Sequence, residues 1–309
     1  MNNPANRARA FAPGSIGNVG PGLDILGLAI AGAGDAVTLE WNEGDTSVVD
    51  DPGHPDLPTD PLRNTASIAA LAVLRRLGTS RGIRIRIEKG LPLSGGQGGS
   101  AACAIAGAVA ANALAGGNLD HRTLLSAALE AESAVAGRHL DNLAPSLVGG
   151  LVLVRSTEPP EIIRIPVPSA LRVVLAHPDQ RLDTRDGRSA LPRTIDRDVA
   201  LQQAANVAAM VAGACLADLE LLGRAIDDRI AEPARAPLLP GFIAARAAAL
   251  QAGALGCSIS GAGPTSFALV ASDADADRVA AAMVAGYANS GVSARAIITT
   301  VDHQGARLL

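Results

Sequence analysis

The amino-acid sequence predicts an α+β protein in which antiparallel sheets are covered by helices on one side. Three observations support this fold class. Strand-like and helix-like segments alternate along the 309 residues. Several strand-like segments alternate polar and apolar residues, which is typical of a sheet with one exposed face. A glycine-rich turn at residues 94–99 leads directly into an alanine-rich helix. The length also favours two domains over one.

The first half of the chain contains predicted strands separated by helices and loops. Residues 35–41 and 82–88 alternate polar and apolar side chains, and residues 149–155 form a further apolar strand. Residues 12–24 are rich in glycine and proline and predict a turn, and residues 50–61 contain four prolines and predict a loop that covers a ligand. Helices are expected at 64–77, 101–115 and 120–135.

A domain boundary is expected after residue 158, because the apolar periodicity ends at Glu158 and two prolines follow it. The predicted domains are therefore residues 1–158 and 159–309. In the second of these, strands are expected at 171–176, 256–260, 265–271 and 294–301, and helices at 198–216, 218–230, 242–253 and 274–285.

Composition limits the class of protein. The formal net charge is -4 and no dense run of Lys or Arg occurs, so no nucleic-acid partner is expected. The cysteines Cys103, Cys215 and Cys257 are widely spaced, which indicates neither a disulfide framework nor a zinc site and suits a reducing compartment. The first residues are polar, and the apolar run at 101–115 is too short to span a bilayer. We therefore expect a cytoplasmic protein with no membrane partner.

The segment 91–102, with four glycines in its middle, is the strongest candidate for a binding site. Glycines reach positive φ and let backbone N–H groups approach an anion, and the following helix directs its positive dipole end to the same place. The alternative is a tight connection with no ligand. The loop lacks the lysine that follows the glycines in the P-loop pattern, so a nucleotide would be held mainly by backbone.

Polar residues elsewhere interrupt an otherwise apolar chain at expected turns. Asn18 and Asp24 are the strongly polar residues of the first turn, where the alternative is a simple Asx-type turn. His139 opens the segment 139–142, which follows a helix carrying Glu130 and Glu132. A glutamate beside a phosphate site is a natural Mg²⁺ ligand, although helical glutamates are also often merely solvated.

Arginines form the last group of candidates. Their planar forks suit bidentate capture of a carboxylate or a phosphate. Surface ion pairs account for most arginines of this kind, so one or two are expected to be functional. The segments concerned are 177–188 and 227–235, and a second glycine-rich turn at 260–264 gives the site a further wall.

In their order along the chain, three of these segments resemble the three motifs of the GHMP kinases. They are residues 13–24, residues 92–102 and residues 260–264. Within that superfamily, the segments 139–150, 184–192 and 228–242 are similar to those of the homoserine kinases. The resemblance spans nearly the whole chain. It implies a two-domain fold, with an N-terminal domain of the ribosomal S5 domain 2 type and a ferredoxin-like C-terminal domain.

The resemblance also implies ATP and Mg²⁺ as cofactors, L-homoserine as the substrate, a role in threonine biosynthesis and a homodimer. Asn64 would lie on the adenine side, and Ser100 and Glu132 would hold the metal, with Glu130 as an alternative to Glu132. The residues implied to hold the phosphates are Pro92, Leu93, Ser94, Gly95, Gly96, Gln97, Gly98, Gly99, Ser100, Ala101 and Ala102. Those implied to surround homoserine are Asn18, Asp24, His139, Asn142, Arg188 and Arg235.

The group that accepts the hydroxyl proton stays open between Asp141, Thr184 and the phosphate itself, with Asn142 at the position where related kinases place an aspartate. Two other functions are consistent with the same motifs. One is a GHMP kinase that acts on another small alcohol, and the other is a non-catalytic homologue that binds a nucleotide or a sugar.

Overall fold

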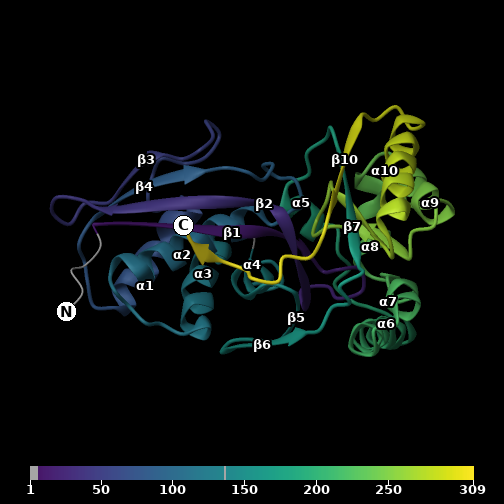
Figure 1. Cartoon of the computed structure of the whole chain (residues 1–309), viewed down its shortest axis with the longest axis horizontal. Coiled ribbons are helices and arrows are strands. Elements are labelled where there is room, and N and C mark those ends of the chain that lie inside the picture. The colour runs from purple at the N-terminus through teal and green to yellow at the C-terminus, as the bar shows by residue number, and fades with distance from the viewer. Residues whose placement is uncertain (1–5, 136) are drawn as a thin grey trace.

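The computed structural model describes residues 6–135 and 137–309, and it confirms the α+β class. Two sheets lie side by side along the long axis of the molecule, and each is covered by its own helices (Figure 1). The C-terminus of the chain lies at the N-terminal half (Figure 1). The fold therefore has two halves, with a seam between them.

A seven-stranded sheet forms the first half. Its strands are β1 (Arg7–Gly17), β2 (Leu26–Trp41), β3 (Val48–Asp51), β4 (Ile83–Glu88), β5 (Leu151–Thr157), β6 (Pro160–Ile165) and β11 (Arg307–Leu308). The main order is β11-β1-β2-β4-β3, and the start of β2 pairs with β5, which pairs with β6. The β3–β4 pair is parallel, and the other pairs are antiparallel.

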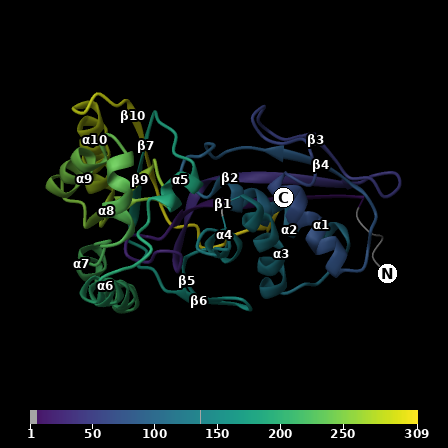
Figure 2. The ribbon, with the colours of Figure 1, turned by 180° about the vertical axis from the view of Figure 1, so that it is seen from behind.

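Four helices cover one face of this sheet, as the two opposite views show (Figures 1 and 2). They are α1 (Thr65–Arg76), α2 (Gly99–Leu114), α3 (His121–Val135) and α4 (Leu143–Val148). Small residues let them pack closely. A Cβ on Gly107 of α2 would lie 2.4 Å from the Ala66 carbonyl oxygen of α1, so this contact requires glycine. The small residues thus let α1 and α2 pack in close contact.

The second half contains a four-stranded antiparallel sheet in the order β10-β7-β9-β8. Its strands are β7 (Arg172–Pro178), β8 (Gly256–Ile259), β9 (Ser266–Val270) and β10 (Ala294–Thr299). The helices are α5 (Thr184–Ser189), α6 (Arg197–Leu216), α7 (Leu219–Arg224), α8 (Ala231–Arg235), the 3-10 turn η1 (Ala236–Leu238), α9 (Phe242–Gln251) and α10 (Asp273–Ala288). With helices between β7 and β8 and between β9 and β10, this is the ferredoxin-like arrangement.

A continuous apolar cluster joins the two halves. Ile16 and Leu28 from the first sheet pack with Phe267 and Leu175 from the second, and Met210 of α6 closes the cluster. The predicted boundary at 158 and 159 falls in the turn between β5 and β6. Because these strands pair with each other, the first sheet continues to Ile165, and the exact division of the chain stays a prediction.

Two local predictions were wrong. The turn expected from residue 12 instead begins as β1, because this segment pairs with β2 as far as Gly17. The helix expected at 218–230 ends at Arg224. A Cβ on Gly223 would lie 2.5 Å from the Leu255 backbone, and a new turn then leads to α8.

Candidate functional site

A cleft of about 510 Å³ opens at the seam between the two halves. Residues of the first half form most of its lining, and Arg181, Asp183 and the 261–263 backbone contribute from the second half. Arg181 lies 3.7 Å from the Asp56 carboxylate, and Ser94 donates a hydrogen bond of 3.3 Å to Asp183. These contacts join the two sides of the cleft at its edge.

The glycine-rich loop forms the floor of the cleft. Gly96 and Gly98 have φ of 70° and 68°, and Gly98 is the N-cap of α2 without a side-chain cap. The hydroxyls of Ser260 and Thr265 each donate a hydrogen bond of 2.5 Å to carbonyls of the loop, those of Gly96 and Gly95. The loop is thereby fixed to the second half, and the first N–H groups of α2 are left for an anion.

Most of the predicted phosphate-loop residues line the cleft, and three do not. Those that line it are Pro92, Leu93, Ser94, Gly95, Gly96, Gly98, Gly99 and Ser100. Gln97 is 3% exposed, and its Nε2 donates to Thr265 Oγ1 at 3.2 Å, so its side chain packs between the halves. Ala101 and Ala102 are fully buried in the core beneath the loop.

Glu132 and Glu130 lie in different environments. Ser100 donates a hydrogen bond of 3.2 Å to Glu132 Oε2, and both residues line the cleft. Burial raises the pKa of Glu132 to about 7, and the negative charge of Asp141 contributes to this. Glu130 instead forms ion pairs of 2.7 Å with Arg75 and Arg76 at the surface. Of the two glutamates, Glu132 is therefore the one placed to hold a cation in the cleft.

Asn64 also lines the cleft, together with the loop residues Asp56, Leu57 and Pro58. Its Oδ1 accepts hydrogen bonds from the first N–H groups of α1, and its Nδ2 donates to the Pro58 carbonyl at 3.0 Å. Asn64 thus caps α1 and holds the proline-rich loop against the cleft, and a ligand-covering role for this loop stays a prediction.

Beyond Asn142, a charged cluster lies next to the cleft. Arg188 of α5 makes a bidentate pair with Asp24, at 2.7 and 3.1 Å, and His139 Nδ1 lies 3.3 Å from the same carboxylate. Burial raises the pKa of Asp24, but the hydrogen bond from Arg188 and the neighbouring positive charges outweigh it, so the pKa lies below its ordinary value. Burial lowers the pKa of His139, and the charge of Arg188 adds to this.

Asn18 and Arg235 complete this cluster. Asn18 Oδ1 accepts the Asp24 N–H at 3.1 Å, and both residues have positive φ, of 67° and 62°. Arg235 is 3% exposed and donates from Nε to the Gly187 carbonyl and from Nη1 to the Gly261 carbonyl, at 3.0 and 2.9 Å. Burial lowers the pKa of Arg235, and the nearby Arg188 lowers it further. Of the six residues predicted to surround a substrate, Asn142 lines the cleft and the other five form the charged cluster next to it.

The candidate proton acceptors lie between the cleft and this cluster. Asn142 lines the cleft, and its Oδ1 accepts from Ser15 Oγ at 3.0 Å. Asp141 is buried beside it and accepts the Asn18 N–H at 3.2 Å. Burial raises the pKa of Asp141 to about 7, helped by the negative charge of Asp24. Thr184 begins α5, and its side chain lies outside the described part of the chain.

One functional candidate, Lys89, was not predicted from the sequence. It lines the cleft, and its ammonium pairs with the buried Asp35 carboxylate and lies 3.5 Å from the sulfur of Cys103. A Cβ on Gly99 would lie 3.4 Å from its Nζ, so the positive charge sits beside the start of α2. One signal could have revealed it, because Lys89 is the only lysine in a chain whose other basic residues are arginines.

Comparison with known proteins defines the class to which this fold and cleft belong. Residues 64–150 match the family described as GHMP kinases N terminal domain, and residues 210–289 match GHMP kinases C terminal. The chain belongs to the GHMP kinase family and, within it, to the homoserine kinases.

The homoserine kinase of Chlorobaculum tepidum is 40% identical over 97% of both chains. That of Arabidopsis thaliana is 42% identical over 97% of this chain and 84% of its own length. The crystal structure of homoserine kinase from Cytophaga hutchinsonii superposes with a TM-score of 0.92 at 40% identity, covering 100% of this chain and 99% of that one. A mevalonate kinase of L. major, 18% identical with a TM-score of 0.72, shares the fold.

Proposed function

We propose that this protein is a homoserine kinase that transfers the γ-phosphoryl group of ATP to the side-chain hydroxyl of L-homoserine, a step of threonine biosynthesis. The observation that carries the proposal is the arrangement of the cleft. The glycine-rich loop and Glu132 line the cleft, and the ion pair of Asp24 and Arg188 lies next to it, beyond Asn142. The high identity to homoserine kinases along the whole chain supports the same substrate.

ATP is proposed to bind with its phosphates against residues 92–100 and its base toward Asn64. Backbone N–H groups and the dipole of α2 would stabilise the negative charge of the phosphates. The ammonium of Lys89 would contribute to this stabilisation. Mg²⁺ fits this site because the Ser100 hydroxyl and the Glu132 carboxylate lie 3.2 Å apart at the floor of the cleft. When bound there, the ion would neutralise charge on the phosphate oxygens.

Homoserine is proposed to bind at the charged cluster next to the cleft. An amino acid carries one ammonium and one carboxylate, and Asp24 and Arg188 present the two complementary charges side by side. Arg235 supplies a second fork for the substrate carboxylate, while Asp24 and His139 receive the ammonium. This orientation would direct the hydroxyl past Asn142 toward the phosphate loop.

Catalysis is proposed to rest on positioning and charge neutralisation, because phosphoryl transfer requires little covalent chemistry from the protein. Asn142 would hold the hydroxyl by a hydrogen bond. Asp141 is our candidate for the proton acceptor, since a carboxyl with a pKa of about 7 can exchange a proton near neutral pH. Thr184 and the phosphate itself stay as the alternatives.

The proposed function is tested by ADP release with ATP and Mg²⁺, comparing L-homoserine with mevalonate, galactose, L-serine and L-threonine. Turnover with homoserine alone is the expected result. Turnover with another alcohol would show a GHMP kinase of different specificity, and ATP binding without turnover of any of the five would point to a non-catalytic homologue.

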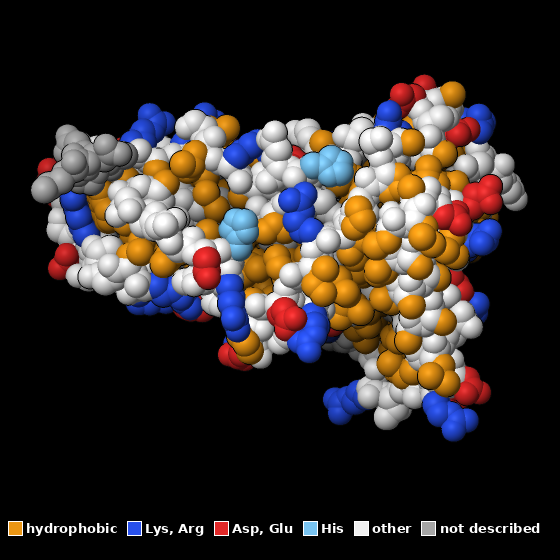
Figure 3. All heavy atoms as spheres, turned by 60° about the horizontal axis from the view of Figure 1, so that its bottom comes forward, with side chains coloured by type: hydrophobic (Ala, Val, Ile, Leu, Met, Phe, Trp, Pro, Cys, Tyr) orange, Lys and Arg blue, Asp and Glu red, His pale blue; other side chains and the backbone are white. Residues whose placement is uncertain are grey.

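We also propose a cytoplasmic homodimer with no membrane or nucleic-acid partner and domains of residues 1–158 and 159–309. By length and composition alone, α6 could cross a membrane, and 28% of its most apolar stretch is buried. Its polar residues Gln203 and Asn206 are buried against the protein, whereas Leu201, Ala208 and Leu216 on the other side are exposed. Figure 3 shows hydrophobic side chains gathered over the second half of the molecule, which contains α6. A second copy of the chain would cover them.

A further inference from the structure

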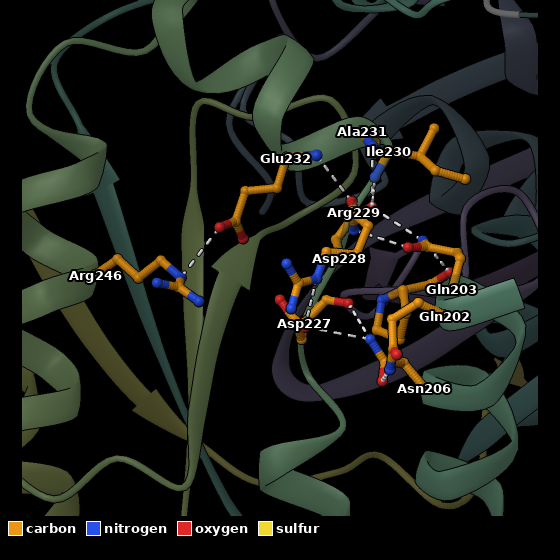
Figure 4. Close-up of polar contacts among 11 residues, drawn as sticks. Gln202, Gln203, Asn206, Asp227, Asp228, Arg229, Ile230, Ala231, Glu232 and Arg246 are labelled. Atoms are coloured by element: carbon orange, nitrogen blue, oxygen red, sulfur yellow. Dashed lines mark hydrogen bonds and ion pairs between the residues drawn. The ribbon is translucent and has the colours of Figure 1, made fainter. Parts of the chain in front are cut away.

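A buried carboxylate fixes the short helix that carries Arg235. Oδ1 of Asp228 accepts the backbone N–H groups of Ile230 and Ala231, both at 2.9 Å, and Oδ2 accepts that of Glu232 at 2.9 Å (Figure 4). Asp228 itself is 7% exposed. Three of the N–H groups at the entry to α8 are therefore satisfied by one side chain.

Gln203 of α6 extends this network to the substrate turn. Its Nε2 donates to Asp228 Oδ1 at 3.0 Å and to the Pro21 carbonyl at 2.7 Å, and its Oε1 accepts the Arg229 N–H at 2.8 Å. Pro21 lies within the turn between Asn18 and Asp24. Figure 4 shows Gln203 beside Asp228 and Arg229, and with the bond to Pro21 this one amide connects the Asn18–Asp24 turn with the segment that leads into α8.

The position of α8 depends on such anchors because a helix of five residues is not stable by itself. A second anchor lies on the far side, where the Glu232 carboxylate accepts from Ser258 Oγ at 2.6 Å and pairs with Arg246 at 3.1 Å. Arg235 ends α8, and its guanidinium reaches the carbonyls of Gly187 and Gly261. A shift of α8 would therefore move the fork of Arg235 directly.

We infer that Asp228, together with Gln203, is a positioning residue that sets Arg235 and the Asn18–Asp24 turn at the separation needed to bind the substrate carboxylate and ammonium. The inference rests on the proposed function, in which these groups bind homoserine. Asp228 does not touch the substrate; its effect is transmitted through α8.

The test compares Asp228→Asn with Asp218→Asn in the full-length chain. Asn keeps one acceptor oxygen but places an N–H₂ group against an N–H donor at the start of α8. We expect the KM for homoserine to rise about tenfold, the scale of one lost charge-assisted hydrogen bond, while the KM for ATP stays within about twofold. Asp218 is the matched control, because it caps α7 by accepting the Leu221 N–H at 2.9 Å away from Arg235, and its replacement should change neither KM.

A double-mutant cycle distinguishes an effect of Asp228 on the position of Arg235 from a general loss of stability. If Asp228 acts through Arg235, Asp228→Asn should raise the homoserine KM by less than about twofold when it is added to Arg235→Leu. Independent, multiplicative effects would overturn the inference, as would an equal rise of both KM values for Asp228→Asn alone. Gln203→Glu gives a second variant, since it removes the donor to both Pro21 and Asp228 and places a second carboxylate beside Asp228, and it should show the same selective rise.

Failure of the proposed function and failure of the positioning role give different results. An unmodified chain that does not phosphorylate homoserine would overturn the proposed function and this inference with it. An active chain in which Asp228→Asn and Gln203→Glu fold normally by circular dichroism and leave the homoserine KM unchanged would overturn the positioning role alone.

Discussion

At the scale of single residues, the site contains three acidic side chains whose pKa values are shifted in opposite directions. Asp24 has a pKa below its ordinary value because Arg188 and His139 outweigh the effect of burial. Glu132 and Asp141 have pKa values of about 7, because burial disfavours their charged forms and each lies near another carboxylate. The environment therefore separates a permanent anion from two groups whose ionisation near neutral pH depends on the charges placed beside them.

The first prediction at this scale concerns which of the two glutamates, Glu130 or Glu132, is needed for activity. Glu132→Gln should lower kcat by about 100-fold, because the cleft loses the carboxylate that we propose as a Mg²⁺ ligand. Glu130→Gln is the matched control on the same helix. Its exposed ion pairs with Arg75 and Arg76 contribute little, so kcat should stay within about twofold. Steady-state rates across a Mg²⁺ titration measure both, and equal losses in the two variants would contradict the assignment.

Asp141 gives a prediction about stability and pH. Its pKa is raised from 3.8 to about 7 on folding, so between these values the folded state binds more protons than the unfolded state. Its contribution to the free energy of unfolding is therefore fully present at low pH and is lost as the pH rises through 7. The upper limit of this loss is about 1.4 kcal/mol for each pH unit that separates the folded and unfolded pKa values.

Urea unfolding of the wild type and of Asp141→Asn at pH 4.5, 6 and 7.5 measures this effect. The wild type should lose stability relative to Asp141→Asn as the pH rises across this window. A difference between the two proteins that stays constant with pH would show that Asp141 does not titrate there.

Some individual residues were beyond sequence reasoning. The sequence does not distinguish Glu130 from Glu132, since a separation of two residues on a helix does not say which one faces the cleft. Gln97 lies in the phosphate loop yet binds Thr265, a contact made by residues 168 positions apart. Lys89 precedes the glycines, whereas the lysine of the P-loop pattern follows them, so that pattern does not predict it.

At the scale of elements, the phosphate loop is defined by backbone conformation. Gly98 has φ of 68°, and a Cβ there would lie 2.2 Å from Ser15 Oγ. Gly98→Ala should therefore distort the loop and raise the KM for ATP by at least about tenfold, beyond the roughly 1 kcal/mol of stability that such a substitution costs.

Gly116, just after the end of α2, provides the control. It also has positive φ, of 63°, but has open space around its Cβ position. Gly116→Ala should cost similar stability without changing the KM for ATP. Thermal unfolding and ATP kinetics of both variants test this, and a matching rise of KM in Gly116→Ala would attribute the effect to stability instead.

Most elements were predictable where local pattern determines them. The strands β4 and β10 and the helices α1, α3, α6 and α10 lie within a few residues of their expected bounds, because each carries a clear apolar period or a cap. β1 was not recognised as a strand, since its sequence is rich in glycine and proline and its pairing with β2 and β11 depends on distant residues. The turn beyond α7 was likewise set by Leu255, a tertiary neighbour.

At the scale of the whole molecule, the site exists because the two halves meet. The phosphate loop and Glu132 come from the first half, whereas Arg188 and Arg235 come from the second. Ser260 and Thr265 fix the loop across the seam, and the apolar cluster around Phe267 and Met210 holds the halves together. The sequence could order the motifs along the chain, but only the resemblance to the GHMP kinases indicated that they converge.

The last prediction concerns the whole molecule and states that two copies of the chain form a dimer through α6. The exposed face of α6 presents Leu201, Ala204, Ala208 and Ala212 at helical spacing, so small side chains would let the α6 helices of two copies pack closely. We expect light scattering to give twice the chain mass of 31.1 kDa. Ala208→Glu should shift the mass to that of one chain, because two glutamates would face each other across the symmetry axis.

Ile243→Glu on α9 is the control, since Ile243 is 61% exposed and lies on a different helix from the proposed interface. A wild type of single-chain mass would contradict the homodimer, and a dimer that Ala208→Glu leaves intact would place its interface elsewhere. Because the buried side of α6 carries Gln203, which contacts Asp228 and Pro21, dimer formation would stabilise the helix that holds α8 and the turn between Asn18 and Asp24. The dissociated Ala208→Glu variant should therefore show a higher KM for homoserine than the wild type, with the KM for ATP unchanged.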